Sequence, residues 1–111
     1  MSWYFRSGKL ESPTNSWPAV SGSHGKGVLP KGEYKIGKVT TVVANPPSTD
    51  KKGFAWECPI MPTFSIPKNG LGIHPEANVA EMIGGIGLTN EDTMPTYNAL
   101  KNANGETLMV E

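Results

Sequence analysis

Short runs of aliphatic, β-branched and aromatic residues recur along the whole chain, each bounded by glycine, proline or asparagine. Runs of this kind predict strands. The longest spans residues 33–43, where Gly37 could mark a bulge. A Ser-Gly pair between the first two runs predicts a hairpin turn. The expected strands cover residues 3–5, 9–11, 33–43, 54–58, 64–66, 71–74, 86–88 and 107–110.

Two stretches lack this alternation. Residues 12–30 are rich in serine, glycine, proline and asparagine, which predicts a long surface loop. Residues 45–53 carry two adjacent prolines and an Asp-Lys-Lys triplet, which predicts an exposed turn. Pro59 and Pro62 then restrict where the strand after that turn can pair.

One helix is expected, near the C-terminal end. Thr93 is a suitable N-cap residue, and Pro95 is tolerated in a first helical turn. Tyr97 and Leu100 fall on one face, and Gly105 lies just beyond the end. Many short strands with one late helix predict a mostly β fold, either a small sandwich or a barrel.

Length and charge narrow the function classes. The chain has 111 residues, enough for one modest core, so residues 1–111 are expected to form a single domain. Basic and acidic residues number ten each, so no net field attracts a polyanion, and nucleic acid is not an expected partner. Residues 1–10 contain no long apolar run, so neither a signal peptide nor a transmembrane segment is expected.

Cysteine and histidine are scarce. Cys58 is the only cysteine, which excludes an internal disulfide. Its place in an alternating strand is typical of a buried, inert thiol rather than a displaced nucleophile. Two histidines, one of them His24 in the expected loop, fall short of a zinc site with this single cysteine. No metal and no cofactor are therefore expected.

The segment that carries candidate chemistry spans residues 72–88. His74 ends one expected strand, a ten-residue connection (75–84) separates it from Gly85, and the turn at Gly84 and Gly85 opens the next strand. Thiol acyl transfer needs an imidazole beside the sulfur and backbone N–H groups at a sharp turn for the oxyanion. A histidine at a strand end facing a glycine turn suits those needs, although either feature alone is more often structural.

This segment resembles the His-Pro-Asp-Gly-Asn…Gly-Cys-Ile-Gly-Leu signature of L,D-transpeptidase catalytic domains. The likeness is strongest to the short branch that includes type VI secretion effectors, which are toxins acting on peptidoglycan. Upstream, residues 28–37 are similar to that branch's Pro-x-Gly-x-Tyr-x-Ile-Gly strand, and Ser21-Gly22 to its Ser-Gly loop. With the expected C-terminal helix and strand, the resemblance covers nearly the whole chain.

The resemblance implies roles for individual residues. His74 matches the catalytic histidine, and Gly85 stands in the position of the nucleophilic cysteine. Gly84, Ile86 and Gly87 match the turn around the nucleophile, where the oxyanion is held. Upstream, Trp17, Ser21 and Gly22 are the implied substrate-binding positions. Tryptophans in small β domains more often pack in the core, and that alternative stays open for Trp3, Trp17 and Trp56.

Two further departures from the signature concern the connecting segment. Glu76-Ala77 stands where Asp-Gly is usual, and Glu81-Met82 where Gly-Thr or Gly-Ser is common.

Members of the family cut the stem peptide after the L-centre of diaminopimelate, form an acyl-enzyme and release D-alanine. Water, a second stem peptide or a free D-amino acid then resolves the intermediate. Without a side chain at Gly85 no acyl-enzyme forms, and loss of such a nucleophile costs on the order of a million-fold in rate.

Three interpretations follow. The chain is an L,D-transpeptidase or L,D-carboxypeptidase domain, inactive as written, whose cysteine was replaced by engineering or by drift. Alternatively, it is a nucleophile-free module that binds the stem peptide or another protein in the old cleft. The third interpretation is a structural β domain of a phage or secretion particle. The first implies action at the cell wall after delivery by a secretion apparatus or lysis, with peptidoglycan stem peptides and an immunity protein as partners.

Overall fold

The apolar runs form nine strands and one helix within residues 2–21, 29–41, 50–65, 71–75 and 85–111, which are the residues that the computed structural model describes. The elements are β1 (Ser2–Arg6), β2 (Lys9–Glu11), β3 (Ser16–Val20), β4 (Gly32–Ile36), β5 (Thr40–Thr41), β6 (Trp56–Pro62), β7 (Gly72–Pro75), β8 (Gly85–Leu88), α1 (Met94–Leu100) and β9 (Thr107–Val110).

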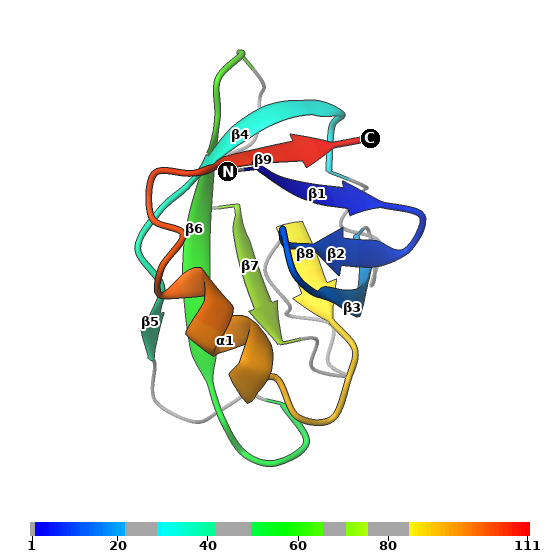
Figure 1. Ribbon diagram of the computed structural model, residues 1–111, viewed down its shortest axis with the longest axis vertical. Coiled ribbons are helices and arrows are strands. Elements are labelled where there is room, and N and C mark those ends of the chain that lie inside the picture. The colour runs from blue at the N-terminus through cyan, green and yellow to red at the C-terminus, as the bar shows by residue number, and fades with distance from the viewer. Residues whose placement is uncertain (1, 22–28, 42–49, 66–70, 76–84) are drawn as a thin grey trace.

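The strands join into one sheet that closes on itself. Their order is β4-β9-β1-β2-β3-β8-β7-β6-β5, and β4 pairs with β6 as well as with β9. This double pairing closes a small barrel, so the expectation of a mostly β domain with one short helix is confirmed. Two neighbouring pairs are parallel, β1 with β9 and β7 with β8 (Figure 1).

The predicted opening hairpin is confirmed. β1 and β2 are antiparallel, with Phe5 opposite Leu10. The two residues between them are Ser7, at φ 52°, and Gly8, at φ 72°. Positive φ at both turn residues matches the right-handed twist of the two strands, which explains why a two-residue connection suffices.

The predicted strand over residues 33–43 is interrupted. β4 ends at Ile36, and the chain resumes as β5 only at Thr40. The pairing stops at Gly37, whose N–H donates to the carbonyl of Pro59 at 2.8 Å in line with the β4–β6 register, because Pro59 has no N–H to donate in return. A Cβ at Gly37 would lie 2.9 Å from the Pro59 ring, so only glycine permits this approach. Gly37 therefore marks a break and not a bulge, and residues 42–43 lie outside the described residues.

The predicted loop over residues 12–30 is wrong for part of its length. Residues 16–20 form β3, which pairs with β2 and β8. Trp17 and Ala19 are buried there, whereas Ser16, Pro18 and Val20 are exposed. The polar and imino residues that suggested a loop occupy the outward positions of a strand.

The other expected strands differ mainly in their ends. β6 begins at Trp56 and continues through Pro59 and Pro62, which pair opposite Gly72 and Tyr34. The closing strand β9 matches its expected range, residues 107–110. Of the run 64–66, residues 64 and 65 belong to no strand, and residue 66 lies outside the described residues.

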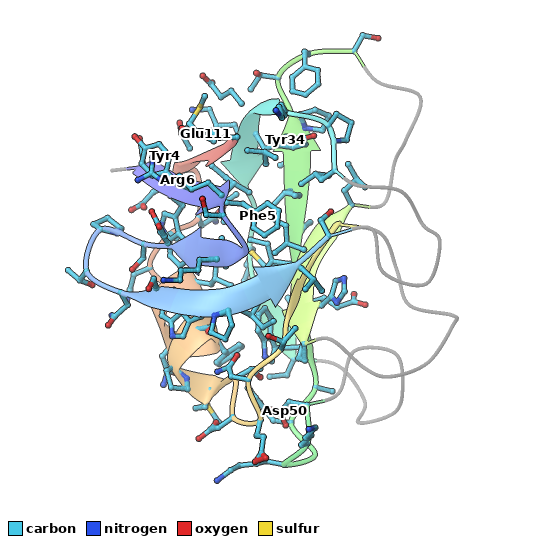
Figure 2. The ribbon with its side chains drawn as sticks, turned by 90° about the vertical axis from the view of Figure 1, so that its right-hand side faces the viewer. Tyr4, Phe5, Arg6, Tyr34, Asp50 and Glu111 are labelled. Carbon is cyan, nitrogen blue, oxygen red and sulfur yellow. The ribbon has the colours of Figure 1, made fainter. Side chains whose placement is uncertain are left out.

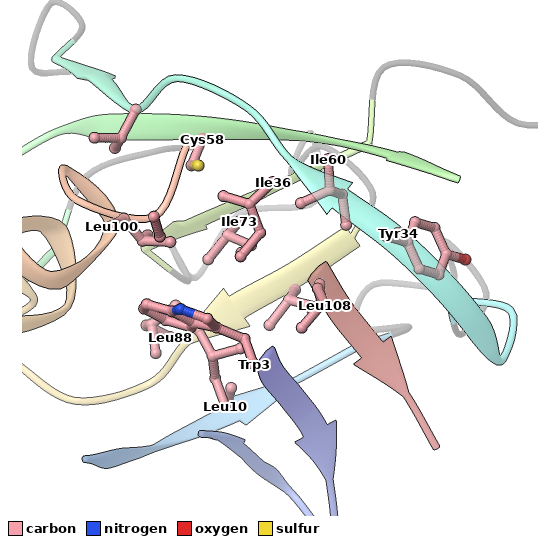
Figure 3. Packing of buried hydrophobic residues seen from close by; sticks show 14 of the residues in the cluster. Trp3, Leu10, Tyr34, Ile36, Cys58, Ile60, Ile73, Leu88, Leu100 and Leu108 are labelled. Atoms are coloured by element: carbon pink, nitrogen blue, oxygen red, sulfur yellow. The ribbon is translucent and has the colours of Figure 1, made fainter. Parts of the chain in front are cut away.

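Aromatic and aliphatic side chains from nearly every element fill the barrel. Trp3 stacks on Trp17 with ring centroids 5.8 Å apart. From α1, Tyr97 packs edge-on against Phe54 at 5.0 Å and lies 6.2 Å from the ring of Trp56, which seats the helix beside the start of β6. The fully buried aliphatic residues, several of them visible in Figure 3, are Leu10, Ile36, Ile73, Ile86, Leu88, Leu100 and Leu108.

A buried polar network fastens the start of α1 to β6. The carboxylate of Asp50 accepts hydrogen bonds from the Thr93 hydroxyl at 2.7 Å and from the Thr93 N–H at 3.0 Å. The Thr93 hydroxyl in turn accepts one from the indole N–H of Trp56 at 2.8 Å. Asp50 is only 8% exposed, so the prediction of an exposed turn is wrong at this residue.

The helix itself is confirmed, but its predicted cap is wrong in mechanism. Thr93 occupies the N-cap position without a capping bond from its side chain, because its hydroxyl is committed to the network. Asp92 substitutes for it, accepting a hydrogen bond from the Met94 N–H at 3.1 Å. Pro95 lies in the first turn, as expected.

The Asp50 network makes the stability of the fold depend on pH. Burial acts to raise the pKa of Asp50, but hydrogen bonds from Thr93, Phe54 and Lys52 outweigh it and hold that pKa below the usual range. A depressed pKa stabilises the fold above the unfolded pKa of about 3.9, and this contribution disappears as pH falls through the folded value. We expect urea unfolding to show the advantage of the natural protein over Asp50→Asn shrinking below about pH 4. A difference independent of pH would contradict this assignment.

Candidate functional site

His74 lies on the outer face of the barrel. β7 and β8 run parallel, with Ile73 opposite Ile86 and His74 opposite Gly87. Both isoleucines belong to the core, so alternation along the strand directs the side chain of His74 to the other face. The residue is nevertheless fully buried.

The ring of His74 is held in one tautomer. Nδ1 lies 3.0 Å from the carbonyl oxygen of Pro75, which can only accept, so Nδ1 carries the hydrogen and donates it. In the neutral ring Nε2 is then a hydrogen-bond acceptor. This atom is buried and has no hydrogen-bond partner among the described residues. Buried polar atoms are nearly always satisfied, and the described residues supply no partner for Nε2, which makes it the candidate recognition atom of this site.

Residues from β3, β6 and β8 lie in one row across the sheet with His74 of β7. Gly87 lies opposite it on β8, and Val20 lies opposite Gly87 on β3. On β6, Cys58 pairs with Ile73, so continuing that register by one residue places Glu57 across from His74. Glycine at position 87 leaves the backbone beside the imidazole without a side chain.

A pocket adjoins this row. It has a volume of about 370 Å³ and reaches Gly72, which precedes His74 by two residues and shares its face of β7. The lining combines apolar walls with an ammonium, a hydroxyl and a carboxylate: Lys38, Thr40, Glu57, Cys58, Pro59, Leu71 and Gly72. Such a mixture suits a ligand with both polar and apolar parts.

Gly85, the position matching the nucleophile, opens β8 opposite Gly72. Its φ is 120°, and a Cβ there would lie 2.1 Å from the carbonyl oxygen of Gly72. A cysteine at this position therefore does not fit unless the two strands move apart. The register also places His74 opposite Gly87, which follows Gly85 by two residues, about 6–7 Å along the strand.

Of the other residues predicted for the turn, the structure describes Ile86 and Gly87. Ile86 and Gly87 are strand residues within β8, so the expected turn does not include them. The side chain of Ile86 is fully buried in the core, which is a structural role. Gly84 lies outside the described residues.

The upstream positions do not join this site as predicted. Trp17 is 9% exposed and stacks on Trp3, so it belongs to the core and does not line a groove from a loop. Ser21 accepts a hydrogen bond from the Leu29 N–H at 2.9 Å through its hydroxyl, which braces the chain. Gly22 and His24 lie outside the described residues.

Cys58 is a core residue. It is fully buried, and burial raises the pKa of its thiol to about 12. Its sulfur lies 3.5 Å from the carbonyl oxygen of Gly37, to which the thiol donates. The prediction of a buried thiol is confirmed, and its protonated state argues against a displaced nucleophile.

This burial predicts slow thiol chemistry. At about pH 8 the Cys58 thiol of the folded protein is expected to resist a disulfide reagent, because almost no thiolate exists and the sulfur is inaccessible. Absorbance of the released reagent anion should rise only on adding urea. Rapid release from the native protein, with circular dichroism unchanged, would contradict the assignment.

Sequence reasoning missed two polar residues. Glu57 alternates with Trp56 and Cys58, so its outward direction was readable, but its neighbour His74 depends on a pairing between distant strands. Asp50 has no local signal for burial, since its main partner is Thr93.

Within the described part of the chain, no three His, Cys, Asp or Glu residues gather as metal ligands. No helix in the same part is long and apolar enough to cross a membrane. No protein-family model, curated protein or solved structure matches this chain.

Proposed function

We propose that the chain is an L,D-transpeptidase-like domain that binds peptidoglycan stem peptides beside His74 and, as its sequence stands, does not transfer the acyl group. The observation that carries the proposal is the buried Nε2 of His74, for which the described part of the chain offers no hydrogen-bond partner. The sequence motif around residues 72–88 supplies the chemical class of the ligand.

The chemistry of the site supports binding better than catalysis. With a neutral ring, Nε2 accepts a hydrogen bond, so it requires an N–H or O–H from the ligand, and a peptide amide offers one. Gly87 lets a peptide backbone approach β8, because this neighbour of His74 carries no side chain. Gly85 provides no nucleophile, and its backbone leaves no room for one.

The full burial of His74 adds one condition. A ligand reaches Nε2 only through a movement that uncovers the ring, so part of the binding free energy is spent on that movement. Modest affinity is therefore expected. If stem peptides are the ligand, the place of action is the peptidoglycan layer, and an effector role would add delivery by a secretion apparatus or lysis and an immunity protein as a partner.

The decisive experiment is a titration of the isotope-labelled protein with a diaminopimelate-containing tetrapeptide, followed by NMR. We expect saturable shifts at the amides of Gly72 and Gly87 and no release of D-alanine. His74→Phe should abolish the shifts, because phenylalanine keeps the ring but cannot accept the hydrogen bond. The mirror-image tetrapeptide, with the same composition and charge, controls for nonspecific contact.

Met61→Ala is the matched variant, since Met61 is 53% exposed on β6 and its removal should leave binding unchanged. Absence of saturable shifts in the folded protein would overturn the proposal and favour a structural β domain. Equal binding by His74→Phe would also reject His74 as the recognition residue. A Gly85→Cys variant probes ancestral activity less directly, because the added side chain overlaps Gly72.

A further inference from the structure

One end of the barrel holds a second cavity, of about 490 Å³. β1, β3 and β9 finish at this end and β4 begins there, as their pairing directions require. Figure 2 shows Phe5 between the strands, with Arg6 and Glu111 close by. The apolar part of the lining consists of Phe5, Ala19, Val20, Leu29, Pro30 and Val110.

Hydrogen bonds fix the walls of this mouth. Ser21 ties down Leu29 through its hydroxyl, and the hydroxyl of Tyr34 donates to the carbonyl of Pro30 at 2.7 Å. On the other side, the Ala19 N–H donates to the carbonyl of Gly8 at 3.1 Å. A cavity with braced walls does not close by collapse, so its apolar surface remains available to a ligand.

Two cationic side chains, Arg6 and Lys31, lie at the rim of the cavity, and they differ in their ion pairs. Arg6 bridges Glu11 at 3.0 Å and Glu111 at 3.5 Å, so its charge is compensated. Lys31 also lines the mouth and makes no ion pair with any residue that the structure describes. Among the described residues, Lys31 is therefore the cation of this rim whose ammonium has no ion pair.

We infer that the barrel mouth binds an aliphatic carboxylate. The hydrocarbon chain lies against Phe5, Ala19 and Val110, and the carboxylate pairs with the ammonium of Lys31. The mouths of small β-barrels are frequent ligand sites, because the closed wall buries a hydrocarbon chain while side chains at the rim bind its head group. The inference does not rest on stem-peptide binding at His74, although Val20 lines this cavity and also lies opposite Gly87 in the row beside His74.

A chain-length series tests the inference. Hexanoate, octanoate and decanoate, each kept below its micelle concentration, are titrated into the labelled protein. Each added methylene should tighten binding roughly three- to four-fold until the cavity is filled. The shifted resonances should include Phe5, Ala19 and Val110. Decanol and decylammonium should bind more weakly than decanoate, and the ammonium most weakly.

Variants separate the two parts of the site. Val20→Asp places a carboxylate at the mouth of the cavity on an exposed residue, so the fold should persist while decanoate binding is lost. Met61→Asp, an equally polar change on another exposed strand residue, is the control. Lys31→Gln should reduce the preference for decanoate over decanol by about two- to five-fold.

Three results would overturn the inference: affinity independent of chain length, shifts confined to other residues, or decylammonium binding as tightly as decanoate. His74→Phe should leave the series unchanged, so a negative stem-peptide titration and a negative carboxylate titration are read independently.

Discussion

Thr93→Val should lower the free energy of unfolding by roughly 2–4 kcal/mol, measured by urea denaturation at neutral pH. Valine keeps the shape of threonine and removes only the hydroxyl. The indole N–H of Trp56 then loses its acceptor, and the buried carboxylate of Asp50 loses its shortest hydrogen bond, at 2.7 Å. Each group would remain desolvated without the compensating bond, which is where the cost arises.

Thr96→Val is the matched control. Thr96 is also fully buried on the same helix, but its hydroxyl has no hydrogen-bond partner among the described residues. Removing an unsatisfied hydroxyl relieves a desolvation cost, so this variant should be neutral or slightly more stable. Equal losses for the two variants would mean that the Asp50–Thr93–Trp56 network contributes nothing beyond packing.

Gly85→Ala should destabilise the fold by roughly 3–5 kcal/mol, through strain at positive φ and overlap between neighbouring strands. The added Cβ would lie 2.1 Å from the carbonyl oxygen of Gly72 and 2.8 Å from its nitrogen. These are backbone atoms, so relief requires β7 and β8 to separate, which disturbs the surroundings of His74. Urea denaturation and the NMR spectrum of His74 would report both effects.

Comparing Gly8→Ala with Gly85→Ala separates the cost of a positive φ from the cost of steric overlap with the neighbouring strand. Gly8 also has a positive φ, at 72°, but nothing lies within 4 Å of an added Cβ. Its cost should be confined to the left-handed conformation, about 1–2 kcal/mol. If Gly85→Ala costs no more than Gly8→Ala, β8 adapts to a side chain readily. A cysteine at position 85 would then be structurally acceptable, and the enzyme interpretation would gain over the binding module.

Local signals were sufficient for some elements. The opening hairpin, the helix and β9 were predictable because turn residues, a cap position and apolar spacing all lie within a few residues of one another. β3 was missed because serine and proline stand at its outward positions. The closure of the barrel was not predictable, since the double pairing of β4 joins segments far apart in the chain.

The candidate site was predictable to a similar degree. The motif identified His74 and the glycines of β8, but motif spacing carries no register. The pairing of β7 with β8 decides that His74 faces Gly87 instead of Gly85. The roles of Asp50 and Glu57 depend on partners on other elements, Thr93 and the strand β7. The alternation of β6 shows that Glu57 points outward, but the sequence does not show which distant residues these two side chains meet.

The position of β9 between β4 and β1 has a consequence for biosynthesis. The first hairpin leaves the ribosome before residues 107–110 do, so the edge of β1 that β9 covers stays unpaired until β9 has been made. An open strand edge recruits other chains, and long-range pairing is slow to form. Nascent chains of this protein should therefore be open to strand pairing with other chains until β9 pairs with β1 and β4.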